Sequence, residues 1–237
     1  MEKIKESTVG SMVADNLKVA SVFDKYGIDY CCKGNRTLEQ VCKIHGLDPD
    51  TIVEEINSAI DAPSKAGYDF NNWPIDLLAD YIEKTHHRYV QKAIPEIVRK
   101  LEKITDVHGE GHPELSDVLM MFKDSAIALT NHMRKEELVL FPFIREMVNE
   151  GSPASDQMPL NSVTNPIRQM MIEHDTEGER FARMSAITNA YTVPSDGCNT
   201  YKLTMDMLKE FENDLHLHIH LENNILFPKA LKLESAS

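Results

Sequence analysis

One eleven-residue pattern occurs twice in this chain and constrains its fold more than any other feature. The copies begin at His132 and His218, and each reads His, three residues, Glu, four residues, Phe-Pro. The two carboxylates are Glu136 and Glu222. Residues four apart lie on the same face of an α-helix, so each copy presents an imidazole beside a carboxylate. Each copy therefore predicts a helix that offers two metal ligands from one face.

A lone histidine precedes each copy at a similar distance. His86 lies 46 residues before His132, and His174 lies 44 residues before His218. This repeat predicts two helical hairpins, hence an all-α fold with an antiparallel four-helix bundle, in which inward-facing His and carboxylate side chains can build a dinuclear metal site. The predicted ligands are His86, His132, Glu136, His174, His218 and Glu222.

The choice of histidine on the fourth helix follows from alignment of the two Phe-Pro pairs. His216, His218 and His220 alternate there, and the alignment matches His218 to His132. His216 and His220 lie roughly 160 to 200° away around an α-helix, which predicts that both face solvent.

A similar choice arises on the first helix, where His86 and His87 are adjacent and only one can face inward. Ile82 and Val90 lie one α-helical turn to either side of His86. Their apolar character favours His86 as the inward residue.

The doubled pattern favours a metal site over a hydrogen-bonded core. A single histidine on an apolar face is more often a core residue, but a carboxylate buried without a partner costs several kcal/mol. Imidazole and carboxylate ligands without thiolate suit iron, manganese or zinc. Two bridging carboxylates would leave positions open for a small ligand, which favours iron; a structural zinc bundle is the alternative.

Acidic residues beside His174 are candidates for supporting the site. Glu173 and Asp175 flank that histidine. Metal-bound imidazoles usually donate their other N–H to an oxygen, so either carboxylate can act as acceptor or proton carrier. The alternative is a solvated acidic face that continues through Glu177 and Glu179.

The four cysteines, at 31, 32, 42 and 198, do not form a disulfide framework in a chain of 237 residues. Cys31 and Cys32 are adjacent and followed by Lys33, which together with a nearby helix start predicts reactive thiols. The alternative is two small residues in a turn. Cys42 and Cys198 are interpreted as structural.

Helix signals divide the chain into a small helical domain at 1–62, a linker at 63–73 and the bundle at 74–237. In the small domain, Gly27 is placed to end a helix, and Thr37 and Gln40 have capping-box spacing. A further helix ends before Gly46, and Asp48 precedes the next. Three such helices bury little surface alone, so we expect them to dock on the bundle or on a second chain.

Net charge excludes two classes of partner. At −13, the chain lacks the basic surface that nucleic acids and anionic membranes require. No stretch reaches the roughly 18 apolar residues of a membrane span, and the first residues lack the apolar run of a signal peptide. We therefore expect a cytoplasmic protein.

The whole pattern closely resembles the RIC family, the bacterial proteins for repair of iron centres. The resemblance rests on the segment Asp29-Tyr30-Cys31-Cys32, on the His132 and His218 motifs with their Leu-Phe-Pro endings, and on His174-Asp175. It implies a hemerythrin-like bundle behind a short Cys-containing domain. It also implies two non-haem iron ions, bridged by carboxylates and an oxo group, on the six ligands predicted above.

The same resemblance implies repair of iron–sulfur clusters damaged by nitric oxide or oxidative stress. Iron donation to client iron–sulfur proteins and nitric oxide reduction at the di-iron centre are both open, and only the second would make the protein an enzyme. Cys31 and Cys32 would relay iron, electrons or nitric oxide. The alternative function is a hemerythrin-like carrier or sensor that binds dioxygen or nitric oxide without turnover. A homodimer is compatible with the sequence.

Overall fold

The computed structural model describes residues 2–62, 68–150 and 162–236, and these residues are helical throughout apart from turns and loops. Their only bridge of β type joins Thr8 to Thr37. The chain forms two compact units, one of residues 79–218 and one of residues 1–78 with 219–237. Among the described helices, none is long and apolar enough to cross a bilayer. The predicted all-α class is confirmed.

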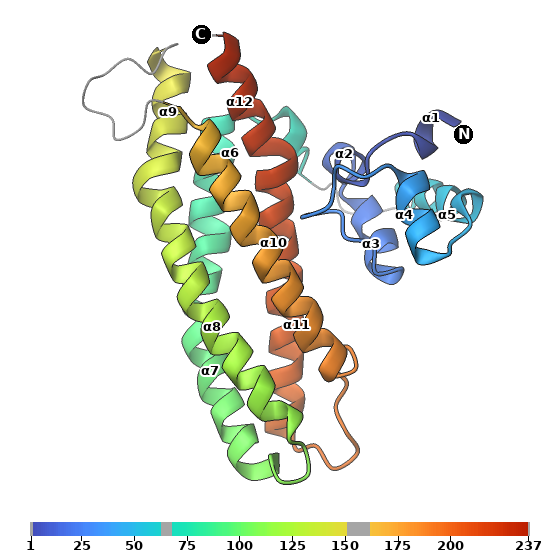
Figure 1. Ribbon diagram of the computed structural model, residues 1–237, viewed down its shortest axis with the longest axis vertical. Helices are drawn as coiled ribbons and strands as arrows, with labels where there is room; N and C mark the ends of the chain where they lie inside the picture. Colours follow the sequence, from blue (N-terminus) through green and yellow to red (C-terminus); the bar gives the residue numbers. More distant parts are fainter. Residues whose placement is uncertain (1, 63–67, 151–161, 237) are drawn as a thin grey trace. The chain divides into compact units, whose positions relative to one another are not determined.

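Long helices form most of the first of these units (Figure 1). They are α7 (Arg88–His108), α8 (Glu114–Lys135), α10 (Thr164–Ile187) and α11 (Asn199–Leu221). The shorter α6 (Ile75–Tyr81) leads into α7, and α9 (Phe141–Glu150) follows α8. This is the predicted bundle, with Pro95 inside α7. The stretch 151–166 is polar and contains three prolines, which predicts a crossover loop between the hairpins, and its residues 151–161 lie outside the described part.

Aromatic side chains from different helices fill the bundle core. The Phe211 ring of α11 lies 5.3 Å from that of Phe122 on α8 and 5.6 Å from that of Phe181 on α10, between ring centroids. All three side chains are fully buried. Burial of a large apolar side chain contributes about 1.5–3 kcal/mol, and aromatic pairs add about 0.5–1.5 kcal/mol. This core fixes the helices that carry the candidate site.

Within the described residues, three π-helical segments interrupt the long helices. They are Ile82–His87 before α7, Glu136–Leu140 between α8 and α9, and Glu222–Leu226 between α11 and α12 (Phe227–Ala236). A π turn closes i→i+5 bonds and so inserts one extra residue into the helical register. One of these irregularities begins at Glu136 and ends two residues before Pro142. Such turns occur frequently at functional sites.

The second unit begins with the short helices α1 (Glu2–Lys5), α2 (Val9–Asp15), α3 (Lys18–Lys25), α4 (Leu38–His45) and α5 (Pro49–Asp61). The capping box of Thr37 and Gln40 is present, Gly46 ends α4 with φ 66°, and Asp48 caps α5. These local predictions are confirmed. Apolar residues from Met12 to Phe23 recur with helical spacing and predict one helix, but the structure forms α2 and α3 there, because extended backbone at Asn16 separates them.

The C-terminal residues 219–237 belong to this second unit. Helix α2 packs against the π segment Glu222–Leu226. Lys229 donates hydrogen bonds to the carbonyls of Asn71 and Trp73. In the predicted linker, residues 63–67 are outside the described part, while Phe70–Asn72 forms a 3-10 turn with Phe70 buried.

Candidate metal centre

Two histidines and a carboxylate meet inside the bundle at the end of α8. His132 and Glu136 lie one turn apart, with His132 Nε2 3.3 Å from Glu136 Oε1. His174 of α10 faces them, and its Nε2 lies 3.0 Å from Nε2 of His132. All three side chains are buried, with Glu136 at 0% exposure. Two ring nitrogens this close must share a proton or a cation between them.

The other oxygen of Glu136 faces a second pair of histidines. Its Oε2 lies 3.3 Å from Nε2 of His87, which ends the first π segment. The ring of His87 lies 5.0 Å from that of His218, between centroids. Each oxygen of the Glu136 carboxylate therefore faces a different histidine pair, the arrangement that a bridging ligand needs.

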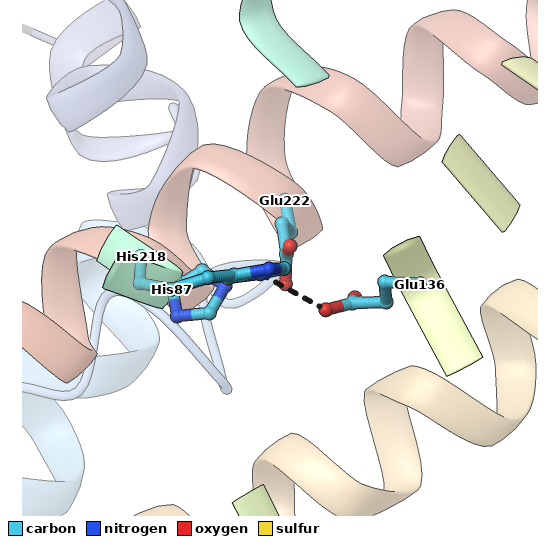
Figure 2. Close-up of side chains that lie close together, drawn as sticks. All are labelled: His87, Glu136, His218 and Glu222. Atoms are coloured by element: carbon cyan, nitrogen blue, oxygen red, sulfur yellow. Dashed lines mark ion pairs between the residues drawn. The ribbon is translucent and has the colours of Figure 1, made fainter. Parts of the chain in front are cut away.

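The second carboxylate, Glu222, lies four residues after His218 and is also fully buried. Figure 2 shows His87, Glu136, His218 and Glu222 pointing toward one another. One ligand atom of each lies within 4.8 Å of the others. A second set of the same kind consists of His132, Glu136, His174 and Glu222. The two sets share both glutamates. They contain five of the six predicted ligands.

The remaining predicted ligand, His86, is outside these sets, and His87 takes its place. His86 is buried, but its Nδ1 lies 2.9 Å from Asp214 Oδ1 on α11. The prediction assumed an α-helical period from Ile82 to Val90. The π segment Ile82–His87 adds one residue to that turn, so the residue that reaches Glu136 comes one position later.

Carboxylates lie behind two of the histidines and fix their ring orientation. Nδ1 of His132 lies 2.9 Å from Glu173 Oε2, and Nδ1 of His87 lies 3.0 Å from Glu137 Oε1. The contact with His132, together with Lys135 and Gln169, lowers the pKa of Glu173 to about 2 despite partial burial. An ionised carboxylate only accepts, so Nδ1 of His132 carries the proton of this hydrogen bond and Nε2 keeps its lone pair for the site interior.

Sequence reasoning named Glu173 for this role but overlooked Glu137. The sequence did contain a hint of this role, because Glu137 immediately follows the candidate ligand Glu136. Only the structure shows that the partner of Glu137 is His87. Asp175, the other acidic neighbour of His174, is exposed. Glu177 is buried and accepts a hydrogen bond of 2.6 Å from Ser125, so the acidic face expected there is not uniformly solvated.

The donor set fits two metal ions. Four buried imidazoles and two buried carboxylates converge, and burial of two anions without compensating cations would cost several kcal/mol each. All the donors are nitrogen or oxygen, as iron, manganese and zinc accept. His87, His218 and the two glutamates could hold one ion, and His132, His174 and the same glutamates the other.

The adjacent cysteines occupy a tight loop of the second unit. Asp29 Oδ1 accepts hydrogen bonds from the backbone N–H groups of Cys31 and Cys32, at 3.2 and 2.9 Å, and from that of Lys33. Both cysteines are free thiols, with their sulfurs 3.7 Å apart. The hydrogen bond with Cys32, together with burial, raises the pKa of Cys31 well above its usual value. The expectation that Lys33 and a helix start favour a thiolate is therefore wrong for Cys31.

Two asparagines hold this loop on the turn that carries Glu222. Asn223 Nδ2 donates to the Cys31 carbonyl at 3.2 Å, and Asn224 Nδ2 donates to the Tyr30 carbonyl at 3.2 Å. A Cβ added to Gly10 would lie 2.1 Å from Asn224 Oδ1, so only glycine permits this approach. The backbone that bears the thiols is thus fixed to residues directly after a candidate metal ligand.

His220 lies in the same contact and is fully buried, so the expectation that it faces solvent is wrong. Its ring lies 5.7 Å from that of Tyr30 between centroids, and its Nδ1 lies 3.2 Å from Asn224 Nδ2. Burial lowers the pKa of His220 to about 4. The face that a lone helix would turn to water is covered here by the cysteine loop. His216, by contrast, is half-buried.

Comparison with known proteins agrees with this geometry. The hemerythrin HHE cation-binding domain matches residues 79–230, and a domain of unknown function called ScdA_N (DUF542) matches residues 5–60. The chain is 32% identical over 237 residues to the iron–sulfur cluster repair protein YtfE of Yersinia pestis (strain Pestoides F), covering 97% of this chain and 99% of that protein. This chain belongs to the RIC family.

YtfE of Yersinia pseudotuberculosis serotype IB (strain PB1/+) gives the same figures, 32% identity with 97% and 99% coverage. The two matched domains lie in the order that the sequence resemblance implies, with the cysteine domain first. The hemerythrin match includes all of the residues that converge in the bundle. The match to ScdA_N includes Cys31 and Cys32.

Proposed function

We propose that the site binds two iron ions, with Glu136 and Glu222 as bridging ligands and His87, His132, His174 and His218 as terminal ligands. The facing oxygens of Glu136 support the bridge, because each lies 3.3 Å from a histidine of a different pair. Bound iron would supply redox chemistry and open positions for a small ligand. An oxo bridge between the ions belongs to the same proposal.

The protein would act in repair of iron–sulfur clusters damaged by nitric oxide or oxidants, with damaged iron–sulfur proteins as its clients. The observation that carries this proposal is the attachment of the Cys31 carbonyl to Asn223, the residue after Glu222. Displacement of the cysteine loop would therefore also shift the backbone next to Glu222, a proposed metal ligand. A carrier of diatomic gas needs no such connection between a thiol pair and its metal site.

Two chemistries can serve this function, and the chain's residues suit each differently. In iron donation, Cys31 and Cys32 would act as accepting thiols, and Asp29 adds a third donor within 4.8 Å of both. In reduction of nitric oxide to nitrous oxide, the outer carboxylates Glu173 and Glu137 would hold the histidines, and Cys31 and Cys32 would deliver electrons.

Repair can be tested with a dehydratase whose [4Fe–4S] cluster has been damaged by nitric oxide. The purified, iron-loaded protein should restore dehydratase activity without added iron. A Glu136→Leu variant should not, whereas Glu179→Leu, which changes an exposed glutamate, should match the wild type. Equal recovery with the Glu136→Leu variant would contradict the proposal.

Nitrous oxide measured in the same reactions separates the two chemistries. Its formation with recovery of the dehydratase supports reduction, and recovery with loss of iron from the protein supports donation. Reversible binding of nitric oxide or dioxygen, with neither nitrous oxide nor recovery, would indicate a hemerythrin-like carrier or sensor.

A further inference from the structure

A second group of titratable side chains lies at the other end of α7, roughly 30 Å along the helix from His87. His108 ends α7, and Glu114 begins α8, two residues after His112. Asp196 and Cys198 precede α11. All of these residues belong to the bundle unit. None of them belongs to the metal centre, so the cluster has no part in the function proposed above.

The two histidines of this cluster have different hydrogen-bond partners. His112 Nε2 lies 3.1 Å from Asp196 Oδ1, and its Nδ1 lies 3.2 Å from Glu114 Oε1. His108 instead faces sulfur, with Nε2 3.3 Å from Sγ of Cys198. The buried ring of Tyr201 packs edge-on against both imidazoles, with centroids at 5.5 and 5.7 Å. The imidazole of His108 is thereby held toward the thiol.

Cys198 differs from the buried thiols in its surroundings. It is exposed, although sequence reasoning interpreted it as structural, whereas Cys31 and Cys42 are buried. The hydrogen bond with His108 is the main cause that lowers the pKa of Cys198, to about 7, and the backbone N–H groups of Tyr201 and Thr200 at the start of α11 assist. For Cys42, burial raises the pKa.

We propose that Cys198 and His108 form a reactive thiolate–imidazolium pair that exchanges with low-molecular-weight disulfides, which makes Cys198 a site of reversible mixed-disulfide formation. The Cys198 sulfur attacks one sulfur of the disulfide, forming a new S–S bond as the old one breaks. The departing thiolate takes the proton of the His108 imidazolium and leaves as a thiol. The cysteine is oxidised and the disulfide sulfur is reduced, so no further oxidant is needed.

The pH dependence of alkylation tests the pair directly. The full-length protein, with its metal bound, is treated briefly with iodoacetamide between pH 5 and 9, and each cysteine is quantified by peptide mass spectrometry. Cys198 should reach half of its maximal rate near pH 7. His108→Gln, which keeps a polar side chain but removes the imidazole, should move this midpoint up by about one unit or more, toward the roughly 8.5 of a free thiol.

A matched control is His45→Gln, which changes an exposed histidine of the other unit and should leave the midpoint unchanged. The wild-type midpoint is informative by itself, so the test does not depend on the variant folding well. A wild-type midpoint above pH 8 would overturn the proposal. So would a midpoint near 7 that His108→Gln leaves in place, because the helix start alone would then account for it.

Glutathione disulfide tests the chemistry. At pH 7, one glutathione should attach to Cys198 at least threefold faster in the wild type than in His108→Gln, and a reducing agent should remove it. The threefold figure allows for the lower intrinsic nucleophilicity of a more acidic thiol, which offsets part of the gain in thiolate. Cys198→Ser should abolish this adduct while it keeps the metal content. Attachment to Cys32 with Cys198 unmodified would refute the assignment.

Discussion

Substitution of Asn224 by alanine should release the cysteine loop. Asn224 Nδ2 donates to the carbonyls of Tyr30 and Cys31, at 3.2 and 3.3 Å, and contacts Nδ1 of His220. In the variant, Asn223 still donates a hydrogen bond to the Cys31 carbonyl, whereas the Tyr30 carbonyl and Nδ1 of His220 each lose Asn224 as a partner. A loss of about 1–2 kcal/mol for each of these partly buried groups gives about 2–4 kcal/mol for docking of the loop.

The lost docking free energy can be measured as a faster rate of thiol modification. Cys31 is only 4% exposed, so its alkylation requires local opening of the loop. Each 1.4 kcal/mol is tenfold, so the opening constant should rise roughly 30- to 700-fold. The assay is alkylation of Cys31 in the native protein, followed by peptide mass spectrometry, with exposed Cys198 as the internal reference.

A matched control is Asn213→Ala, which changes an exposed asparagine on α11 and should leave the Cys31 rate unchanged. A Cys31 rate in Asn224→Ala within threefold of the wild-type rate would refute the argument that this side chain anchors the loop. Acceleration in both variants would point to general destabilisation instead.

Three further predictions concern the bundle. His87→Leu should lower the iron content below two per chain, because Nε2 of His87 faces Glu136, whereas His86→Leu should leave the iron content unchanged. If elemental analysis shows iron loss for His86→Leu and none for His87→Leu, His86 is the ligand, as the α-helical register predicts. Glu173→Gln should weaken metal affinity by about 10–100-fold in a chelator competition, because the ring of His132 exchanges an anionic acceptor for a neutral amide. An unchanged affinity would count against that role. Phe211→Ala should cost about 3–5 kcal/mol through the cavity it leaves, measured as a lower denaturation midpoint of the bundle, and a loss below 1 kcal/mol would contradict the described core.

Features set by local or repeated sequence were predictable. The capping box at Thr37, the left-handed Gly46 and the cap at Asp48 depend on residues within one turn, and the structure has all three. Convergence of Glu136 and Glu222 followed from the repeat, because equal spacing before Phe-Pro gives both carboxylates the same helical phase.

Features that depend on irregular helix or on distant packing were not predictable. His87 rather than His86 faces Glu136 because a π turn changes the register, and α-helical periodicity carries no sign of such a turn. His220 is buried because Tyr30, 190 positions earlier in the chain, packs against it. Cys198 lies beside His108 because the loop before α11 meets the end of α7, which spacing along one chain segment does not reveal.

The central claim is that the four buried histidines and two buried glutamates hold two iron ions. Elemental analysis of the full-length protein, purified without oxygen, tests this most directly. The account predicts about two iron ions per chain and little zinc. Stoichiometric zinc, or a folded protein that binds no metal when iron is supplied, would contradict it.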